Sequence, residues 1–170
     1  MLSEIQRIQA LGRWGENKTL ALLKHAGFVQ ERDVNAETCN HPFGDIYAER
    51  DGLRYLISVK TRNKFQTSGL LNPSYNVRKK GADVLCIARR YHAQLAWVTV
   101  QVIPERQLFC GYFGTINQIQ VHGERFSIPM QASATSRYEC LADEVTDLRI
   151  RPEWTNGGYS RSRERPLMSN

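Results

Sequence analysis

Residues 43–61, FGDIYAERDGLRYLISVKT, form the stretch that decides the fold. Its Asp51-Gly52 pair is a strong signal for a tight β-hairpin turn, and apolar and polar residues alternate on both sides of it. We therefore predict two antiparallel strands, Phe43 to Glu49 and Leu53 to Thr61, joined by the turn Arg50-Asp51-Gly52.

The same alternation predicts which side chains share a face of the hairpin. Asp45 lies on one face with Tyr47 and Glu49, and on the partner strand Lys60 shares a face with Ser58. Because both lie far from the turn, Asp45 and Lys60 are expected to be neighbours at the open end of the hairpin. An acid and a lysine placed in this way could also be a simple cross-strand ion pair, worth about 0.2–1 kcal/mol.

The first long element is an amphipathic helix, predicted from Ser3 to Ala26, with Glu16 within its apolar stripe. Burying an unpaired carboxylate costs several kcal/mol, so Glu16 should have a partner or a metal ion. The alternative is a slightly rotated helix in which Glu16 pairs with Arg13 or Lys18. The stripe consists of Ile5, Ile8, Gly12, Leu20 and Leu23.

Shorter signals predict the remaining elements, and their order is typical of an α/β fold with a mixed sheet. Cys86 lies in an apolar run and is expected to be a small core residue. The predicted elements are a strand at 28–32, a loop at 64–73, a short helix at 74–80, a buried strand at 82–88, a strand at 95–103, a short helix at 104–109, a hairpin at 118–128 and a helix or strand at 141–148.

The chain has 170 residues, enough for one globular domain with its own core. We expect this domain at 1–150, with a core at about 3–103 and an accessory segment at 104–150. Residues 151–170 are rich in Arg, Ser and Gly, a composition that predicts a flexible basic tail.

The formal net charge of +6 suits a polyanionic partner such as nucleic acid, although many small proteins are mildly basic without binding one. The four cysteines and four histidines are scattered without zinc-site spacing, so we expect no zinc. No apolar run approaches the roughly 20 residues that span a bilayer, and no signal peptide is evident. The expected location is cytoplasmic or nucleoid-associated, without secretion or a membrane partner.

A helix glutamate, a strand aspartate and a strand lysine, in that order, resemble the PD-(D/E)xK, or restriction-endonuclease-like, nuclease superfamily. The matching residues are Gly15-Glu16, Phe43-Gly44-Asp45 and Ser58-Val59-Lys60, and the resemblance covers roughly residues 10–90. It implies an α/β core with a central mixed sheet flanked by helices. Small stand-alone members of this superfamily include junction resolvases, restriction enzymes and intron-encoded homing endonucleases.

The resemblance further implies a Mg²⁺-dependent endonuclease that hydrolyses DNA phosphodiester bonds, with Mn²⁺ as a possible substitute. Asp45, Glu16 and the main-chain carbonyl of Val59 would hold the metal, since Mg²⁺ prefers hard oxygen ligands. Lys60 would orient or help deprotonate the attacking water and stabilise charge at the phosphate, while the metal activates the water.

This sequence departs from the superfamily pattern at two positions. Gly44 replaces a proline, and Ser58 stands where an acid is expected, so that one carboxylate is missing. Ser58 remains a catalytic candidate by position, but a serine is a weak, uncharged metal ligand. Either a relocated acid, Glu16 or Glu49, supplies the missing charge, or the site is impaired.

Polar residues after Lys60 and at the end of the next element are candidate contacts for the DNA backbone, with a solvated loop as the alternative. Cutting both strands of a symmetric duplex would call for two active sites, so a homo-oligomer, dimer or tetramer, is expected. The candidate DNA-binding residues are Arg62, Asn63, Lys64, Gln66, Arg78, Lys79 and Lys80.

Two other functions remain open. A nuclease fold that has lost one acid could be a DNA-binding module that does not cleave. Alternatively, Glu16 and Asp45 could serve as a general acid/base pair on a small substrate, as in glycosidases. The positive charge and the adjacent Lys60 argue against the second of these.

Overall fold

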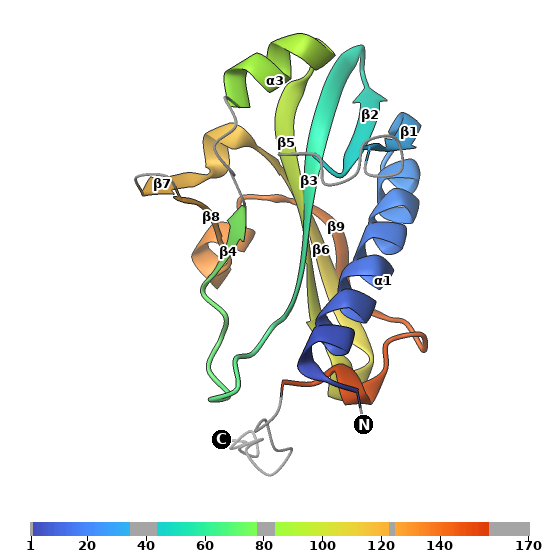
Figure 1. Cartoon of the computed structure of the whole chain (residues 1–170), viewed down its shortest axis with the longest axis vertical. Helices are drawn as coiled ribbons and strands as arrows, with labels where there is room; N and C mark the ends of the chain where they lie inside the picture. Colours follow the sequence, from blue (N-terminus) through green and yellow to red (C-terminus); the bar gives the residue numbers. More distant parts are fainter. Residues whose placement is uncertain (1, 35–43, 78–83, 123–124, 157–170) are drawn as a thin grey trace, which may run out of the picture.

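A six-stranded mixed sheet forms the centre of the protein in a computed structural model that describes residues 2–34, 44–77, 84–122 and 125–156 (Figure 1). The strand order is β1-β2-β3-β5-β6-β9, in which β3 and β5 pair in parallel and all other neighbours are antiparallel. The strands are β1 Val29–Asp33, β2 Ile46–Arg50, β3 Leu53–Asn63, β5 Gln94–Ile103, β6 Leu108–Thr115 and β9 Glu139–Thr146.

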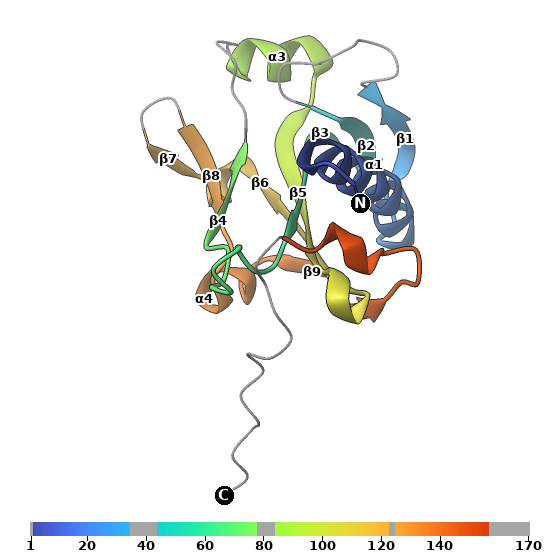
Figure 2. The same cartoon turned by 60° about the horizontal axis from the view of Figure 1, so that its bottom comes forward.

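Different elements cover the two faces of this sheet. Helix α1 (Glu4–His25) packs on one face, and a three-stranded sheet of order β4-β8-β7 lies with helix α3 (Val84–Tyr91) on the other (Figure 2). The predicted α/β architecture, a central mixed sheet flanked by helices, is confirmed. The remaining elements are β4 Ser74–Val77, β7 Gln120–His122, β8 Arg125–Pro129, α4 Ala132–Thr135, and three short 3-10 helices, η1 Pro104–Arg106, η2 Ile116–Gln118 and η3 Pro152–Trp154.

The hairpin predicted around Asp51-Gly52 is present. Strands β2 and β3 pair from Arg50 opposite Leu53 to Ile46 opposite Ile57. Asp51 and Gly52 have φ angles of 55° and 74°, the positive values that a type I′ turn requires at both central positions. The turn thus fixes the register of the two strands, and Asp45 lies just beyond the last pair.

Helix α1 begins at a capping box in which Ser3 and Gln6 satisfy each other's backbone amides. Its buried residues are spaced four apart along one side, and they differ from the predicted stripe. Ile5 and Ile8 are 69% and 46% exposed, because the N-terminal part of the helix turns these side chains away from the sheet. The buried residues are Leu11, Gly15, Thr19 and Leu23.

Two hydrophobic clusters fill the spaces on either side of the main sheet. The cluster under α1 contains Leu23, Phe28 and Val98, whereas the cluster under the small sheet contains Trp97 and Tyr75. The indole of Trp97 is fully buried and donates a hydrogen bond to the carbonyl of Thr115, 3.0 Å away. No described helix is long and apolar enough to cross a membrane.

The buried strand predicted at 82–88 is wrong, because Val84–Tyr91 forms α3. A short apolar run fits a strand or a helix equally well when only the run itself is considered. Here Ile87, Ala88 and Tyr91 pack together against the second cluster, a spacing that only a helix brings to one side. Cys86 is consequently exposed rather than part of the core.

The short helix predicted at 74–80 is also wrong over the described residues, where Ser74–Val77 forms β4. Tyr75 and Val77 are 2% and 3% exposed while Asn76 between them is exposed, which is the alternation of a half-buried strand. Their partners lie far along the chain, in β8. Residues 78–83, the rest of this prediction, lie outside the described residues.

The prediction for 104–109 holds only for η1, since β6 follows from Leu108 and was not expected. At 141–148 the structure selects the strand of the two alternatives. The strands of the predicted 118–128 hairpin are confirmed as β7 and β8. Within the predicted tail of 151–170, Trp154 packs against the core and is only 5% exposed, and residues 157–170 lie outside the described residues.

Candidate active site

A close approach of α1 to β3 sets the position of Glu16. A Cβ atom on Gly15 would overlap the Thr61 hydroxyl, so only glycine allows the helix to lie this near the strand. The next residue, Glu16, is therefore held against the sheet surface and is half-buried.

Asp45 is fixed from both sides directly before β2 begins at Ile46. Its backbone amide donates to the carbonyl of Ile57 at 2.8 Å, and its own carbonyl accepts from the amide of Val34 at 2.9 Å. Its carboxylate oxygen Oδ2 accepts a 2.6 Å hydrogen bond from the amide of Val59. Beyond the last β2–β3 pair, the carboxylate of Asp45 thus accepts the hydrogen bond from β3 that a β2 carbonyl would otherwise accept. This hydrogen bond orients the Asp45 side chain.

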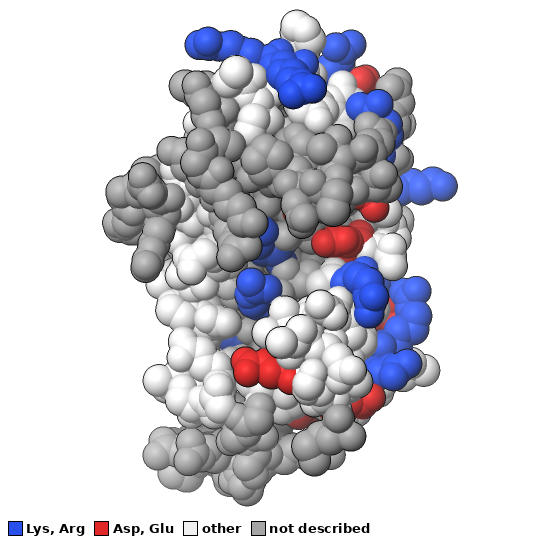
Figure 3. Space-filling view, viewed as in Figure 1, with Lys and Arg blue, Asp and Glu red and all other residues white. Residues whose placement is uncertain are grey.

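The charged side chains of Asp45, Asp33 and Lys60 act on the carboxyl group of Glu16. Burial raises the pKa of Glu16 above its ordinary value, the charges of Asp45 and Asp33 raise it further, and Lys60 lowers it. Lys18, one of the two alternative partners considered for Glu16, instead forms an ion pair with Asp147 at 2.6 Å. The structure therefore brings Glu16, Asp45 and Lys60 into one electrostatic cluster. On the face of the molecule viewed in Figure 3, acidic and basic side chains lie next to one another near the middle.

Asp33 is a member of this cluster that sequence reasoning did not identify. It is the last residue of β1 and lies opposite Ile46, the neighbour of Asp45. Nothing in the neighbouring sequence marks it, because its position depends on the pairing of β1 with β2, which begins only at Ile46. The pairing of these two strands in the folded sheet is what places a third carboxylate near Glu16.

Ser58 and Glu49, the other candidates considered on the hairpin, have different surroundings. Ser58 is 1% exposed, and its hydroxyl has no hydrogen-bond partner among the residues that the structure describes. Glu49 accepts a hydrogen bond from Tyr47 and pairs with Arg54, each at 3.3 Å, toward the turn. Glu49 thus interacts with Tyr47 and Arg54 near the turn, and it does not replace the acid missing at position 58.

The metal ligands expected from the sequence are the carboxylates of Glu16 and Asp45 and the main-chain carbonyl of Val59, and the charge of Asp45 acts on Glu16 in the folded protein. In the described parts of the chain, no three His, Cys, Asp or Glu side chains are arranged to hold a metal together. Mg²⁺ is nevertheless commonly held by only one or two carboxylates, with waters and substrate phosphate completing its shell. The donor set therefore fits Mg²⁺ and does not fit zinc, which favours nitrogen and sulfur ligands.

The predicted DNA-binding residues differ in exposure. Arg62 and Gln66 are exposed, while Lys64 is half-buried with its ammonium 3.9 Å from Glu144. Asn63 is 5% exposed and its amide donates to the carbonyl of Trp154 at 2.9 Å, so it stabilises the fold and does not face a ligand. The three remaining candidates, Arg78, Lys79 and Lys80, lie outside the described residues.

A helix, a hairpin and a parallel strand surround the cluster, an arrangement that this chain shares with a solved structure. One solved structure similar to this chain is the Holliday junction resolvase Hjc from the archaeal hyperthermophile Archaeoglobus fulgidus. The two share 20% sequence identity with a TM-score of 0.53, over 77% of this chain and 97% of the resolvase. No protein-family profile and no curated protein sequence matches the chain.

The raised pKa of Glu16 predicts a pH-dependent stability. The folded state binds this proton more tightly than the unfolded state, so ionisation of Glu16 lowers the free energy of unfolding as pH rises past its ordinary value of 4.5. Without divalent ions, Glu16→Gln should therefore unfold at a higher temperature than the wild type at neutral pH. Thermal unfolding should show this difference shrinking as the pH is lowered toward 4.5, whereas an equal or lower Tm for the variant at neutral pH would contradict it.

Proposed function

We propose that this chain is a divalent-metal-dependent endonuclease that hydrolyses phosphodiester bonds in DNA. The observation that carries the proposal is the convergence of Glu16, Asp45 and Lys60 where β2 separates from β3. The likeness to a Holliday junction resolvase supports it through the fold, and the net charge of +6 supports it through the expected partner.

Each residue of the cluster has a role that follows from its chemistry. Glu16, Asp45 and the Val59 carbonyl would hold Mg²⁺, with Mn²⁺ as a substitute; when bound, such an ion activates water and neutralises the charge that develops at the phosphate. The hydrogen bond from the Val59 amide orients Asp45, so its carboxylate need not be ordered when substrate arrives. The ammonium of Lys60 holds the attacking water and the phosphate oxygens by donating hydrogen bonds.

The substrate that the fold favours is branched DNA, because the similar structure is a resolvase of four-way junctions. Cutting two strands of such a junction calls for two active sites, so we propose a homo-oligomer, first of all a dimer. Arg62, Lys64 and Gln66 would contact the DNA backbone near the site. A homing-endonuclease activity has no support from the fold beyond the shared class.

The test compares a four-way junction, a linear duplex and a supercoiled plasmid, each with Mg²⁺, Mn²⁺ or EDTA. We expect cleavage with either divalent ion, none in EDTA, and a preference for the junction. Lys60→Ala should cut at least about 100-fold more slowly than wild type. Salt-dependent DNA binding without cleavage under any of these conditions would reject the nuclease and leave the DNA-binding module that the missing acid at Ser58 suggests.

A further inference from the structure

A groove of about 590 Å³ lies between α1 and the segment that follows β9, apart from the cluster around Asp45. Four cationic side chains, Arg13, Lys18, Arg149 and Arg151, line it, and no carboxylate does so among the described residues. Three residues with side-chain amides, Gln6, Gln9 and Asn17, also line it. Arginine, lysine and side-chain amides are the groups with which proteins contact DNA phosphates.

Two of the four cationic side chains have no strong ion pair within the protein and can interact with a ligand. Arg13 is exposed and forms no ion pair with another residue in the described part of the chain. Arg151 is 66% exposed and lies 3.8 Å from Glu153, itself half exposed, a contact worth little in water. These two guanidinium groups therefore keep their hydration and their counterions, which a phosphate backbone would displace.

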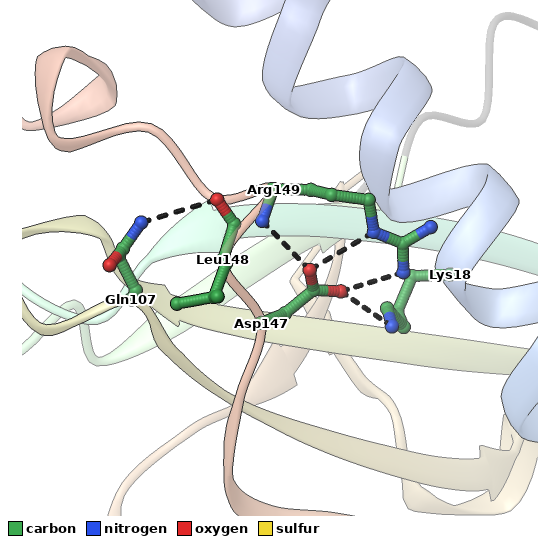
Figure 4. Close-up of polar contacts among 5 residues, drawn as sticks. All are labelled: Lys18, Gln107, Asp147, Leu148 and Arg149. Atoms are coloured by element: carbon green, nitrogen blue, oxygen red, sulfur yellow. Dashed lines mark hydrogen bonds and ion pairs between the residues drawn. The ribbon is translucent and has the colours of Figure 1, made fainter.

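The other two cations are held in place by one buried acid, as Figure 4 shows. Asp147 accepts from the Arg149 guanidinium at 2.8 Å and from Lys18 at 2.6 Å, and it is 8% exposed. The hydrogen bonds from Arg149, and then those from Lys18, hold the pKa of Asp147 well below its usual range. Asp147 thus stays ionised and fixes both cations on the wall of the groove.

The segment after β9 is itself firmly attached. The side-chain amide of Gln107 donates to the carbonyls of Leu148 and Ile150 at 3.2 and 2.9 Å. Further along, the carbonyl of Trp154 accepts from Asn63 and from Arg7. Because these contacts order the groove in the absence of any ligand, little conformational entropy would be lost on binding.

Two tryptophans, with Leu2 and Ala10, form the apolar part of the wall. The rings of Trp14 and Trp154 lie 6.1 Å apart between centroids, and Lys18 lies 5.9 Å from the Trp14 ring. Both indole N–H groups are buried without a hydrogen-bond partner among the residues described. Buried donors left unpaired in this way commonly point to a water or ion that completes the site.

We propose that this groove binds the phosphodiester backbone of a DNA segment away from the cleavage site, which makes it a second, non-catalytic DNA contact. The inference rests on the proposed function, since it takes DNA as the substrate. At about 100° per residue, Trp14 and Glu16 project to opposite sides of Gly15, which contacts β3. One turn of α1 therefore serves both sites, about 10–12 Å apart across the helix, within reach of a single branched substrate.

The salt dependence of binding tests the groove directly. Binding of a labelled four-way DNA junction in EDTA is measured over about 50–200 mM salt for wild type and for Arg13→Gln/Arg151→Gln. If both arginines contact phosphates, the slope of log K against log [salt] should become shallower by about 2. A matched control, Arg89→Gln/Arg137→Gln, removes two exposed arginines outside the groove and should keep the wild-type slope.

An unchanged slope for the groove variant, an equal loss in the control, or no DNA binding at all would overturn the groove proposal. Equal Tm values for the three proteins show that folding is not the cause of a difference. Cleavage with Mg²⁺ is scored separately, so the two proposals fail independently. If binding depends on the groove but no cleavage occurs, the groove proposal stands and the nuclease proposal is rejected. If DNA is cleaved but the salt slope of the groove variant is unchanged, the nuclease proposal stands and the groove proposal is rejected.

Discussion

Replacing Asp45 by asparagine should reduce the single-turnover rate of DNA cleavage by about 10³-fold or more, because it removes the charge that would hold the metal. The amide oxygen of asparagine can still accept the hydrogen bond from Val59. Asp45→Asn also removes a negative charge that raises the pKa of Glu16, so its Tm should equal or exceed that of the wild type. Loss of activity without loss of stability would identify a catalytic role.

Two further variants complete this comparison. Asp45→Ala should be equally inactive, but its free energy of unfolding should be lower by about 1–3 kcal/mol, since the backbone amide of Val59 loses its hydrogen-bond acceptor. Asp51→Asn makes the same chemical change at the other end of the hairpin, where asparagine suits the φ angle of 55°. It should cut DNA like wild type; an active Asp45→Asn, or an inactive Asp51→Asn, would contradict the assignment.

The second large effect concerns the contact that positions Glu16. Gly15→Ala should lower the free energy of unfolding by about 3 kcal/mol, because the new methyl group overlaps Thr61 and must push α1 away from β3. This loss corresponds to a fall in Tm of about 6–12 °C for a domain of this size. The displaced helix would also move Glu16 away from Asp45, so cleavage should fall together with stability.

Gly12 provides the matched control within the same helix. A Cβ atom there has no neighbour within 4 Å, so Gly12→Ala should stabilise the helix by up to about 1 kcal/mol. The two glycine substitutions are thus expected to have opposite signs in chemical denaturation. Adding Thr61→Gly to Gly15→Ala should recover roughly 1–2 kcal/mol as a coupling energy. Equal effects at both glycines, or no coupling with position 61, would show that the close approach does not matter.

Elements specified by neighbouring residues were predictable from the sequence. The Asp51-Gly52 turn requires positive φ angles that few residue pairs adopt, and the alternation beside it leaves one register that buries Ile46 and Ile57. The helix that carries Glu16 begins at a capping box and has an apolar side, although Gly15 and Thr19 rather than the isoleucines form its contact.

Elements that depend on distant partners were not predictable in this way. Tyr75 becomes a strand residue only because Ile128 lies opposite it in β8, and Ile87 lies on a helix whose apolar side needs the second cluster. The candidate site shows the same division. Asp33 is placed near Glu16 by the pairing of β1 with β2. Asn63 is buried because its amide donates a hydrogen bond to the carbonyl of Trp154, 91 residues away.

Binding of a divalent ion by Glu16, Asp45 and the Val59 carbonyl beside Lys60 is tested most directly by cleavage of the protein with bound iron. Fe²⁺ in place of Mg²⁺, with ascorbate and peroxide, generates hydroxyl radicals that cut the backbone nearest the ion. Mass spectrometry should find cuts near residues 16, 45 and 59 that excess Mg²⁺ suppresses and that Asp45→Asn lacks. Cuts elsewhere, or the same cuts in Asp45→Asn, would contradict binding of the ion at these residues.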